Sequence, residues 1–305
     1  TWDQYHILKP LGTYVVDVAF NPKLSVPLMA HCRTAFTMHG MEQFAASRYF
    51  MWHDRLYYTA AMELYCAKAD AILVMTQTGK TDLQKYMNVP DYKIHVIPES
   101  YNEQCRRIED AAELSRVKDE WDLPDKYVLF VGGITPLKNI PTLLRAFKDL
   151  KRRGFPHKLV LVGFRRWNFE RDMALIESLD LKNDVVELGF VGDQDLPGIY
   201  NLADCFVLPS FYEGFGIPIL EAQACGCPVV TSGCGGMREV AGDNAALHFD
   251  VTSPEHLTEQ VATILADAAL RESLIQKGLE NVKRYSWDNT ARQTIRVFNM
   301  LGRLQ

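Results

Sequence analysis

The chain has 305 residues, a formal net charge of −5 and a sequence pI near 5.9. This length suits two domains, and a hydrophobic content of 48% is ordinary for a soluble globular protein. The acidic balance argues against a nucleic-acid-binding protein, which normally presents a concentrated basic surface. No apolar run approaches the ~20 residues of a membrane span, and seven scattered cysteines indicate reduced thiols in a cytoplasmic protein.

Short apolar segments alternate with helical segments in the first half of the chain, as in an α/β protein with a parallel sheet. The predicted elements are strands at 34–38, 71–75 and 94–97 and helical segments at 48–67 and 76–87. The polar stretch 102–126 contains one helical piece and is predicted to connect two domains. We therefore place the first domain at residues 1–115.

The second half shows the same alternation more clearly and predicts a doubly wound open sheet, which binds ligands at the carboxyl ends of its strands. The predicted elements are strands at 127–131, 159–162, 185–188, 205–208 and 228–231 and helices at 140–150, 168–179 and 196–202. Asn139 and Ser286 are predicted helix caps. The second domain is placed at 116–287, and residues 288–305 form a final helix. The sequence leaves open whether this helix crosses back to the first domain.

The most informative stretch of the chain reads SFYEGFGIPILEAQACGCPVV. Glu213 lies on a loop, and Glu221 lies about one turn inside a helix that begins near Pro218. Gly214 and Gly216 allow the backbone to approach a phosphate closely, and the N–H groups of the helix's first turn attract an anion. This layout predicts a sugar-nucleotide site in which Glu213 binds a sugar hydroxyl and Glu221 binds the ribose diol.

Lys138 follows another predicted strand end and supplies a compact positive charge for a diphosphate. Each of these residues also has a purely structural interpretation. Glu221 alone would more often only favour the helix dipole, Lys138 alone would usually be a surface lysine, and a single Gly-x-Gly is weak evidence. Their occurrence together and in sequential register favours the functional interpretation.

Four segments of the second half resemble the nucleotide-sugar-binding domain of retaining GT-B glycosyltransferases of family 4, the glycosyltransferase group 1 type. They read VGGITPLKNIPTLLRAF, ELGFVGDQDLPGIYNLADCFVLPSFYEGFGIPILEAQACGCPVVTS, EVAGDNAALHFD and YSWDNTA, and the similarity runs from Tyr127 to about Val297. The resemblance implies an α/β protein of GT-B fold, with two Rossmann-like doubly wound domains facing a cleft. It also implies transfer of a hexose from a UDP- or GDP-linked sugar to a hydroxyl acceptor, with retention of configuration and without a cofactor.

The resemblance further implies roles for single residues. The glutamate that matches Glu213 lies by the donor hexose, the one that matches Glu221 holds the ribose, and the lysine at position 138 contacts the diphosphate. His39, in TMHGM, matches a histidine near the donor sugar. We therefore expect Glu213, His39 and Lys138 to be catalytic. The residues expected to bind the donor are Gly132, Gly133, Lys138, Arg165, Phe190, Val191, Glu213, Gly214, Phe215, Gly216, Ile217 and Glu221, with main chain at 190–191 facing the base.

The sequence departs from the family pattern in three places. Many members have an arginine where this chain has Gly133, so Arg165 or Arg166 is expected to supply the missing cation. The sequence PESYN at 98–102 stands where a Pro-Asn-Gly type of turn is usual. The family's usual first strand and glycine-rich loop are absent, so we expect an incomplete first domain and further sequence before Thr1.

Two acidic or histidine pairs are set aside as sites. Asp193 and Asp195 could be taken for a metal-binding Asp-x-Asp motif, but Asp195 is better placed to cap a helix, so no catalytic metal is expected. His53 and Asp54 lie among aromatic residues in a helical stretch and suit packing or solvent contact. A basic cluster favours a solvated helix end, with peripheral membrane contact as the alternative. It consists of Lys148, Lys151, Arg152 and Arg153.

Two functions compete with glycosyl transfer. A protein that binds the donor but transfers nothing would agree with the missing arginine and the short first domain. A sugar-nucleotide epimerase would keep the same fold and change the reaction. The sequence specifies neither the sugar nor the acceptor, which could be a carbohydrate or a lipid-linked hydroxyl.

Overall fold

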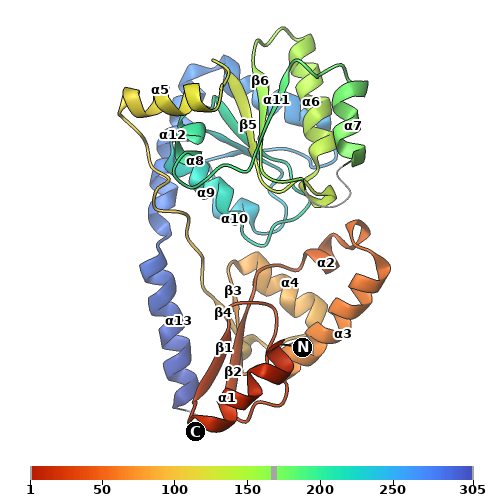
Figure 1. The fold of residues 1–305 in the computed structure, drawn as a ribbon, viewed down its shortest axis with the longest axis vertical. Helices are drawn as coiled ribbons and strands as arrows, with labels where there is room; N and C mark the ends of the chain where they lie inside the picture. The colour runs from red at the N-terminus through yellow and green to blue at the C-terminus, as the bar shows by residue number, and fades with distance from the viewer. Residues whose placement is uncertain (1, 166–169, 304–305) are drawn as a thin grey trace. The chain divides into compact units, whose positions relative to one another are not determined.

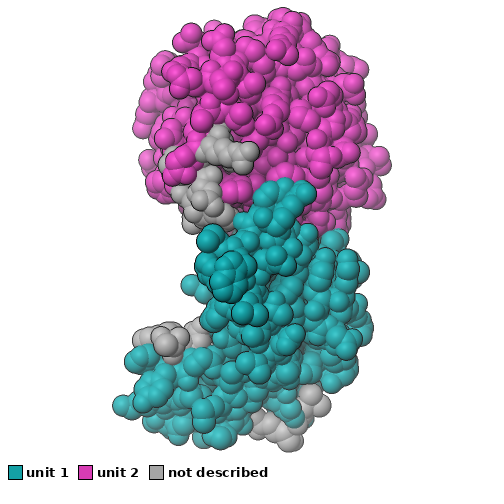
Figure 2. All heavy atoms as spheres, turned by 90° about the vertical axis from the view of Figure 1, so that its right-hand side faces the viewer, with its two compact units in different colours: residues 1–99, 213–215, 285–305 teal, residues 100–212, 216–284 magenta. Residues whose placement is uncertain are grey.

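The computed structural model describes residues 2–165 and 170–303, which form two compact units (Figures 1 and 2). Unit 1 comprises Thr1–Glu99, Glu213–Phe215 and Tyr285–Gln305, and unit 2 comprises Ser100–Tyr212 and Gly216–Arg284. The chain thus passes from unit 1 to unit 2 after Glu99, before the predicted connection 102–126 begins. Apart from Glu213–Phe215, it returns to unit 1 at Tyr285.

Unit 1 is built on a four-stranded parallel sheet in the order β1-β2-β3-β4. The strands are β1 (Val18–Asn21), β2 (Arg33–Met38), β3 (Ala71–Val74) and β4 (Ile94–Val96). The last three match predicted strands to within a residue or so. The strand β1 was not predicted, because this edge strand of four residues is only partly buried and lacks a clear apolar pattern.

The helices of unit 1 include the predicted long segment, which begins as α3 at Trp52. The predicted helix 76–87 is α4, whose first turn is capped by the Thr76 hydroxyl accepting from Gly79 N–H at 3.0 Å. The helical elements are η1 (Trp2–His6), α1 (Leu8–Thr13), α2 (Glu42–Ala45), η2 (Ser47–Tyr49), α3 (Trp52–Lys68), α4 (Gln77–Met87), η3 (Asp91–Lys93) and α13 (Trp287–Gly302).

The final helix, α13, contributes to the core of unit 1 and runs along its sheet (Figure 1). Val297 and Leu301 are buried in one cluster with Ala35 and Leu73 of the sheet. The helix begins where predicted, because the Ser286 hydroxyl accepts from Asn289 N–H at 3.1 Å. The last apolar residues of this helix therefore pack against a sheet that is formed by the first hundred residues.

Unit 2 contains a six-stranded parallel sheet in the order β10-β9-β8-β5-β6-β7. The strands are β5 (Tyr127–Val131), β6 (Lys158–Val162), β7 (Val185–Gly189), β8 (Cys205–Leu208), β9 (Val229–Thr231) and β10 (Leu247–His248). The strand order reverses between β5 and β8, so the predicted doubly wound sheet is confirmed, with its topological switch point at these two strands. Only the two-residue strand β10 was not predicted.

The helices of unit 2 cover both faces of this sheet (Figure 1). In α6, Leu143, Leu144 and Phe147 recur at helical spacing and are buried against the sheet. The helical elements are α5 (Ala111–Glu120), η4 (Pro136–Lys138), α6 (Ile140–Arg152), α7 (Glu170–Ser178), α8 (Leu196–Leu202), α9 (Ile217–Ala224), α10 (Met237–Ala241), α11 (Pro254–Ala266), α12 (Ala268–Asn281) and η5 (Val282–Arg284). Within the described residues, no helix is both long and apolar enough to cross a bilayer.

Two predicted helix caps are wrong, because both side chains find partners outside the helix. Asn139 occupies the N-cap position of α6, but its amide donates to the carbonyl oxygens of Pro209 (3.2 Å) and Val251 (2.9 Å). Asp195 occupies the same position in α8, but its buried carboxylate accepts from Arg116 at 2.8 Å and from the Trp121 indole at 3.3 Å. A buried carboxylate is better compensated by a guanidinium than by one backbone N–H.

Candidate active site

The loops after β5 and β8 meet at the switch point of unit 2. The backbone N–H of Phe211 donates to the carbonyl oxygen of Leu137 at 2.9 Å. The Asn139 amide donates to the carbonyl oxygen of Pro209, which lies in the same loop as Phe211. The side chain of Lys138 passes over Gly132, since its Cε atom lies 3.7 Å from the position of a β-carbon there. The structure thus places Gly132, Gly133 and Lys138 beside the segment that leads to Glu213.

Helix α9 begins directly after this segment and offers an uncapped first turn. Gly216 is its N-cap residue with φ +97°, a left-handed conformation that a glycine adopts without strain. No side chain caps the helix, and Pro218 stands in its first turn. Pro218 has no N–H and the Ile219 N–H donates to the Gly216 carbonyl oxygen at 2.9 Å, so the first-turn donor suited to an anion is the N–H of Ile217.

Glu221 lies one turn inside α9 and is held by a tyrosine that sequence reasoning missed. The Tyr200 hydroxyl of α8 donates to Glu221 Oε2 at 3.1 Å. Burial raises the pKa of the Glu221 carboxyl, the Tyr200 hydrogen bond lowers it, and the charge of Asp193 raises it. The carboxylate is thus desolvated and oriented. No feature of the sequence around Tyr200 distinguishes this residue from a core aromatic.

The residues predicted to face the base, Phe190 and Val191, follow β7, and Phe164 and Arg165 follow the neighbouring strand β6. Phe190 and Phe164 are exposed, and their rings stack with centroids 5.2 Å apart and an interplanar angle of 6°. Val191 is buried. Arg165, expected to replace the missing cation, forms a two-atom ion pair with Glu187 at 2.9–3.1 Å. Its alternative, Arg166, lies outside the described residues.

His39 follows β2 in unit 1, and both of its ring nitrogens face oxygen atoms. Nε2 lies 2.6 Å from the Pro22 carbonyl oxygen, which can only accept, and Nδ1 lies 3.3 Å from Glu99 Oε1. The hydrogen bond with Glu99 is the main reason that the pKa of His39 is raised, against a lowering by burial. Glu99 belongs to the PESYN segment, which departs from the Pro-Asn-Gly type of turn usual in the family. This departure was the only sequence signal that pointed to Glu99 as a partner of His39.

The loop Glu213–Phe215 packs against His39 within unit 1. A β-carbon on Gly214 would overlap the His39 carbonyl oxygen, so only glycine permits this approach. The Thr76 hydroxyl donates to Gly214 O at 3.2 Å and fixes the loop from a second side. The structure therefore brings together two of the predicted catalytic positions, Glu213 and His39.

Within the described part of the chain, no group of three or more His, Cys, Asp or Glu side chains is arranged to hold a metal ion. Asp195 is engaged by Arg116 and Trp121, as described above. Of the residues expected in the site, Lys138 and Glu221 belong to unit 2, and His39 and Glu213 belong to unit 1.

Comparison with known proteins identifies the family. The profile described as Glycosyl transferases group 1 matches residues 112–281, which is more than half of the chain, and the profile Glycosyltransferase Family 4 matches residues 14–104. The chain belongs to the glycosyl transferases group 1 family. This glycosyltransferase is 32% identical to the O-antigen chain mannosyltransferase B of Escherichia coli, over 98% of its own length and 80% of that protein.

Other relatives agree with this assignment. The glycosyltransferase is 31% identical, over 77% of its length, to the serotype-specific mannosyltransferase WbdA of Escherichia coli, and spans 29% of that protein. Among solved structures, Anabaena Alr3699/HepE in complex with UDP and glucose has a TM-score of 0.83 at 17% identity, covering 97% of this chain and 80% of that one. This likeness confirms the GT-B fold expected from the sequence.

Proposed function

We propose that this glycosyltransferase transfers a hexosyl group, with retention of configuration and without a metal, from a nucleoside-diphosphate sugar to a hydroxyl acceptor. The observation that carries the proposal is the switch point of unit 2, where Lys138 follows β5 and the start of α9, which carries the half-buried Glu221, follows the adjacent strand β8. Such a site matches a diphosphate and a ribose in chemistry.

Each residue has a defined task in this reaction. Lys138 and the first turn of α9 stabilise the negative charge that develops on the departing diphosphate. Glu221 accepts hydrogen bonds from the ribose diol. Glu213 binds hydroxyls of the hexose and orients it, and the diphosphate itself serves as the base toward the incoming hydroxyl, so that Glu213 does not attack the sugar.

The names of the relatives suggest the hexose and the acceptor. Two relatives that are about 30% identical are named mannosyltransferases, and one of them acts on an O-antigen chain. We therefore propose mannose as the first candidate hexose, and a terminal hydroxyl of a growing polysaccharide as the first candidate acceptor. The donor nucleotide in this proposal is UDP or GDP.

The test begins with thermal-shift measurements against UDP, GDP and their hexose conjugates, because a ligand of the native state raises the melting temperature. Transfer is then assayed for Glu213→Gln and Glu213→Ala enzymes, with EDTA present, and the anomer of the product is read by NMR. We expect both substitutions to lower turnover by about tenfold or more. Full turnover in either variant would sink the assignment of Glu213.

One observation favours a second function, binding without transfer. Gly133 stands where an arginine was expected, so one cation is missing. Arg165, which was expected to replace that cation, is neutralised by Glu187. A protein that binds the sugar nucleotide tightly but yields neither transfer, hydrolysis nor an epimerised donor would establish this alternative.

A further inference from the structure

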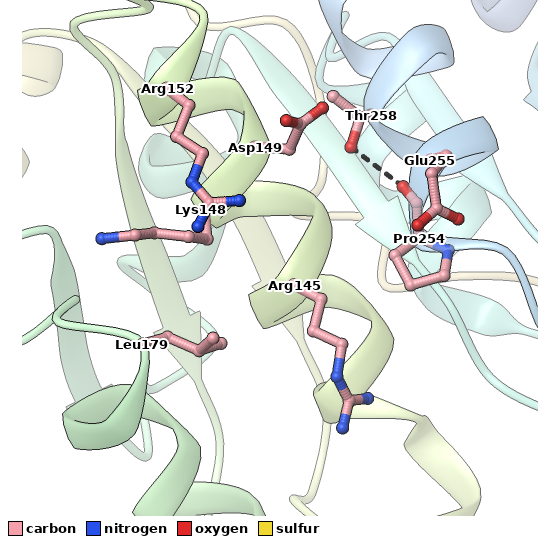
Figure 3. A pocket seen from close by; sticks show the side chains of 8 residues that line it. All are labelled: Arg145, Lys148, Asp149, Arg152, Leu179, Pro254, Glu255 and Thr258. Carbon is pink, nitrogen blue, oxygen red and sulfur yellow. Dashed lines mark hydrogen bonds between the residues drawn. The ribbon is translucent and has the colours of Figure 1, made fainter.

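A cavity of about 290 Å³ lies on the outer surface of unit 2 and shares no residue with the candidate active site. Its lining comes from the exposed side of α6, from the residue that follows α7, and from the start of α11 (Figure 3). The cavity is part of unit 2 alone, so its geometry depends only on the packing of these three helices.

A row of cations forms the wall contributed by α6. Arg145, Lys148 and Arg152 are spaced three and four residues apart and thus share one side of the helix. Within the described part of the chain, Arg145 and Arg152 have neither a hydrogen-bond nor an ion-pair partner. Among the described residues, Lys148 makes only long contacts with Asp180, at 3.4 Å to its carbonyl oxygen and 4.0 Å to its carboxylate.

The helix dipole does not account for the whole row. Arg152 lies in the last turn of α6, where a cation complements the negative end of the helix. Arg145 lies in the middle of the helix, and the dipole effect falls off within a turn. Like charges at these spacings repel one another, and an anion bound beside them would offset that repulsion.

The acidic residues of the lining indicate that the ligand carries hydroxyl groups as well as a phosphate. Asp149 is occupied by Arg153, whose Nε and Nη2 atoms lie 2.9 and 2.8 Å from it. Glu255 is exposed and accepts only a 3.2 Å hydrogen bond from Ser253 among the described residues. A free carboxylate can accept hydrogen bonds from ligand hydroxyls, and Leu179 and Pro254 provide apolar contact.

We propose that this cavity binds a phosphorylated monosaccharide. Lys148 and Arg152 hold the phosphate, and Arg145 and Glu255 bind the sugar hydroxyls. Small-molecule sites usually measure about 300–1,000 Å³. This cavity of about 290 Å³ lies just below that range, so it suits a monosaccharide better than a nucleotide. The inference goes beyond the proposed transfer reaction and does not depend on it.

The test is a titration of the full chain with glucose 6-phosphate, with UDP and GDP present in excess to occupy a nucleotide site. Binding is followed by calorimetry and by the methyl NMR signals of Leu179, which lines the cavity. We expect the Leu179 signals to shift, and a Lys148→Gln/Arg152→Gln variant to lose at least tenfold in affinity. The Lys277→Gln variant, which removes an exposed charge on α12 outside the cavity, should bind normally.

Three results would overturn the inference. They are unshifted Leu179 signals, an unchanged affinity in a folded double variant, and inorganic phosphate binding as tightly as glucose 6-phosphate. Glucose without a phosphate should not bind. Methyl glucoside 6-phosphate identifies the source of the ligand, because equal binding indicates a phosphorylated residue within a glycan and weaker binding a free sugar phosphate. Since none of these measurements uses activity, a failed transfer assay leaves the result intact.

Discussion

Glu221 is a carboxyl group that the fold desolvates and that the proposed donor requires. Its raised pKa means that the ionised form is disfavoured in the native state by burial. For such an acid, the stabilising contribution is present below the pKa of the unfolded chain and is lost as the pH rises through the folded pKa. At neutral pH, ionised Glu221 therefore lowers the stability of the protein.

Replacing Glu221 by Gln should separate stability from binding. Gln can still accept the Tyr200 hydroxyl but carries no charge, so we expect a higher melting temperature at pH 7 and little difference near pH 4. Donor affinity should fall by about ten- to a hundredfold, because hydrogen bonds to charged groups contribute roughly 1.5–3 kcal/mol. A lower melting temperature at pH 7 would show that burial is not what raises the pKa.

The pair His39 and Glu99 predicts a pH dependence of the same sign, with a stabilising contribution that is again lost as the pH rises. The Glu99 hydrogen bond, the Pro22 carbonyl and the charges of Glu99 and Glu42 raise the pKa of His39 above 6.5. This stabilising contribution is fully present below pH 6.5 and is lost as the pH rises through the folded pKa. In a Glu99→Gln variant, the His39 pKa measured by NMR should fall, and the loss of stability relative to wild type should be greatest at acidic pH. An unchanged His39 titration would contradict this.

At the scale of elements, the loop Glu213–Phe215 depends on a close backbone approach that leaves no room for a methyl group at Gly214. A Gly214→Ala substitution should displace the loop from His39 and reduce kcat/KM by about tenfold to a hundredfold, since a shift near 1 Å at a catalytic group has that effect. Gly12→Ala is the matched control, because nothing lies within 4 Å of a β-carbon there. Equal activity of both variants would show that the position of this loop is unimportant.

The sequence predicted the elements of unit 2 well, because its strands are short apolar runs bounded by glycine and polar turns. The start of α9 and the place of Glu221 within it also followed from local sequence. Partners distant in sequence could not be predicted. Tyr200 reaches Glu221, Glu99 reaches His39 and Glu187 neutralises Arg165 only because the fold brings together segments that are distant in the sequence.

At the scale of the whole molecule, α13 is part of the core of unit 1. Leu301 is 2% exposed in that core, whereas the adjacent Met300 is 41% exposed. We expect Leu301→Ala to lower the free energy of unfolding by about 2–5 kcal/mol, the usual cost of a large-to-small change in a core. Urea denaturation would measure the effect, with Met300→Ala as the control. Equal midpoints for the two variants would mean that α13 does not stabilise the unit.

The return of α13 to the first sheet also has a consequence for biosynthesis. The strands β1 to β4 leave the ribosome roughly 190 residues before α13 does. At about 5–20 residues per second, this interval lasts on the order of 10–40 s. During that time the apolar face that Val297 and Leu301 later cover is exposed on the nascent chain. A chaperone that binds apolar segments would therefore find this face of the first sheet accessible until α13 has been synthesised.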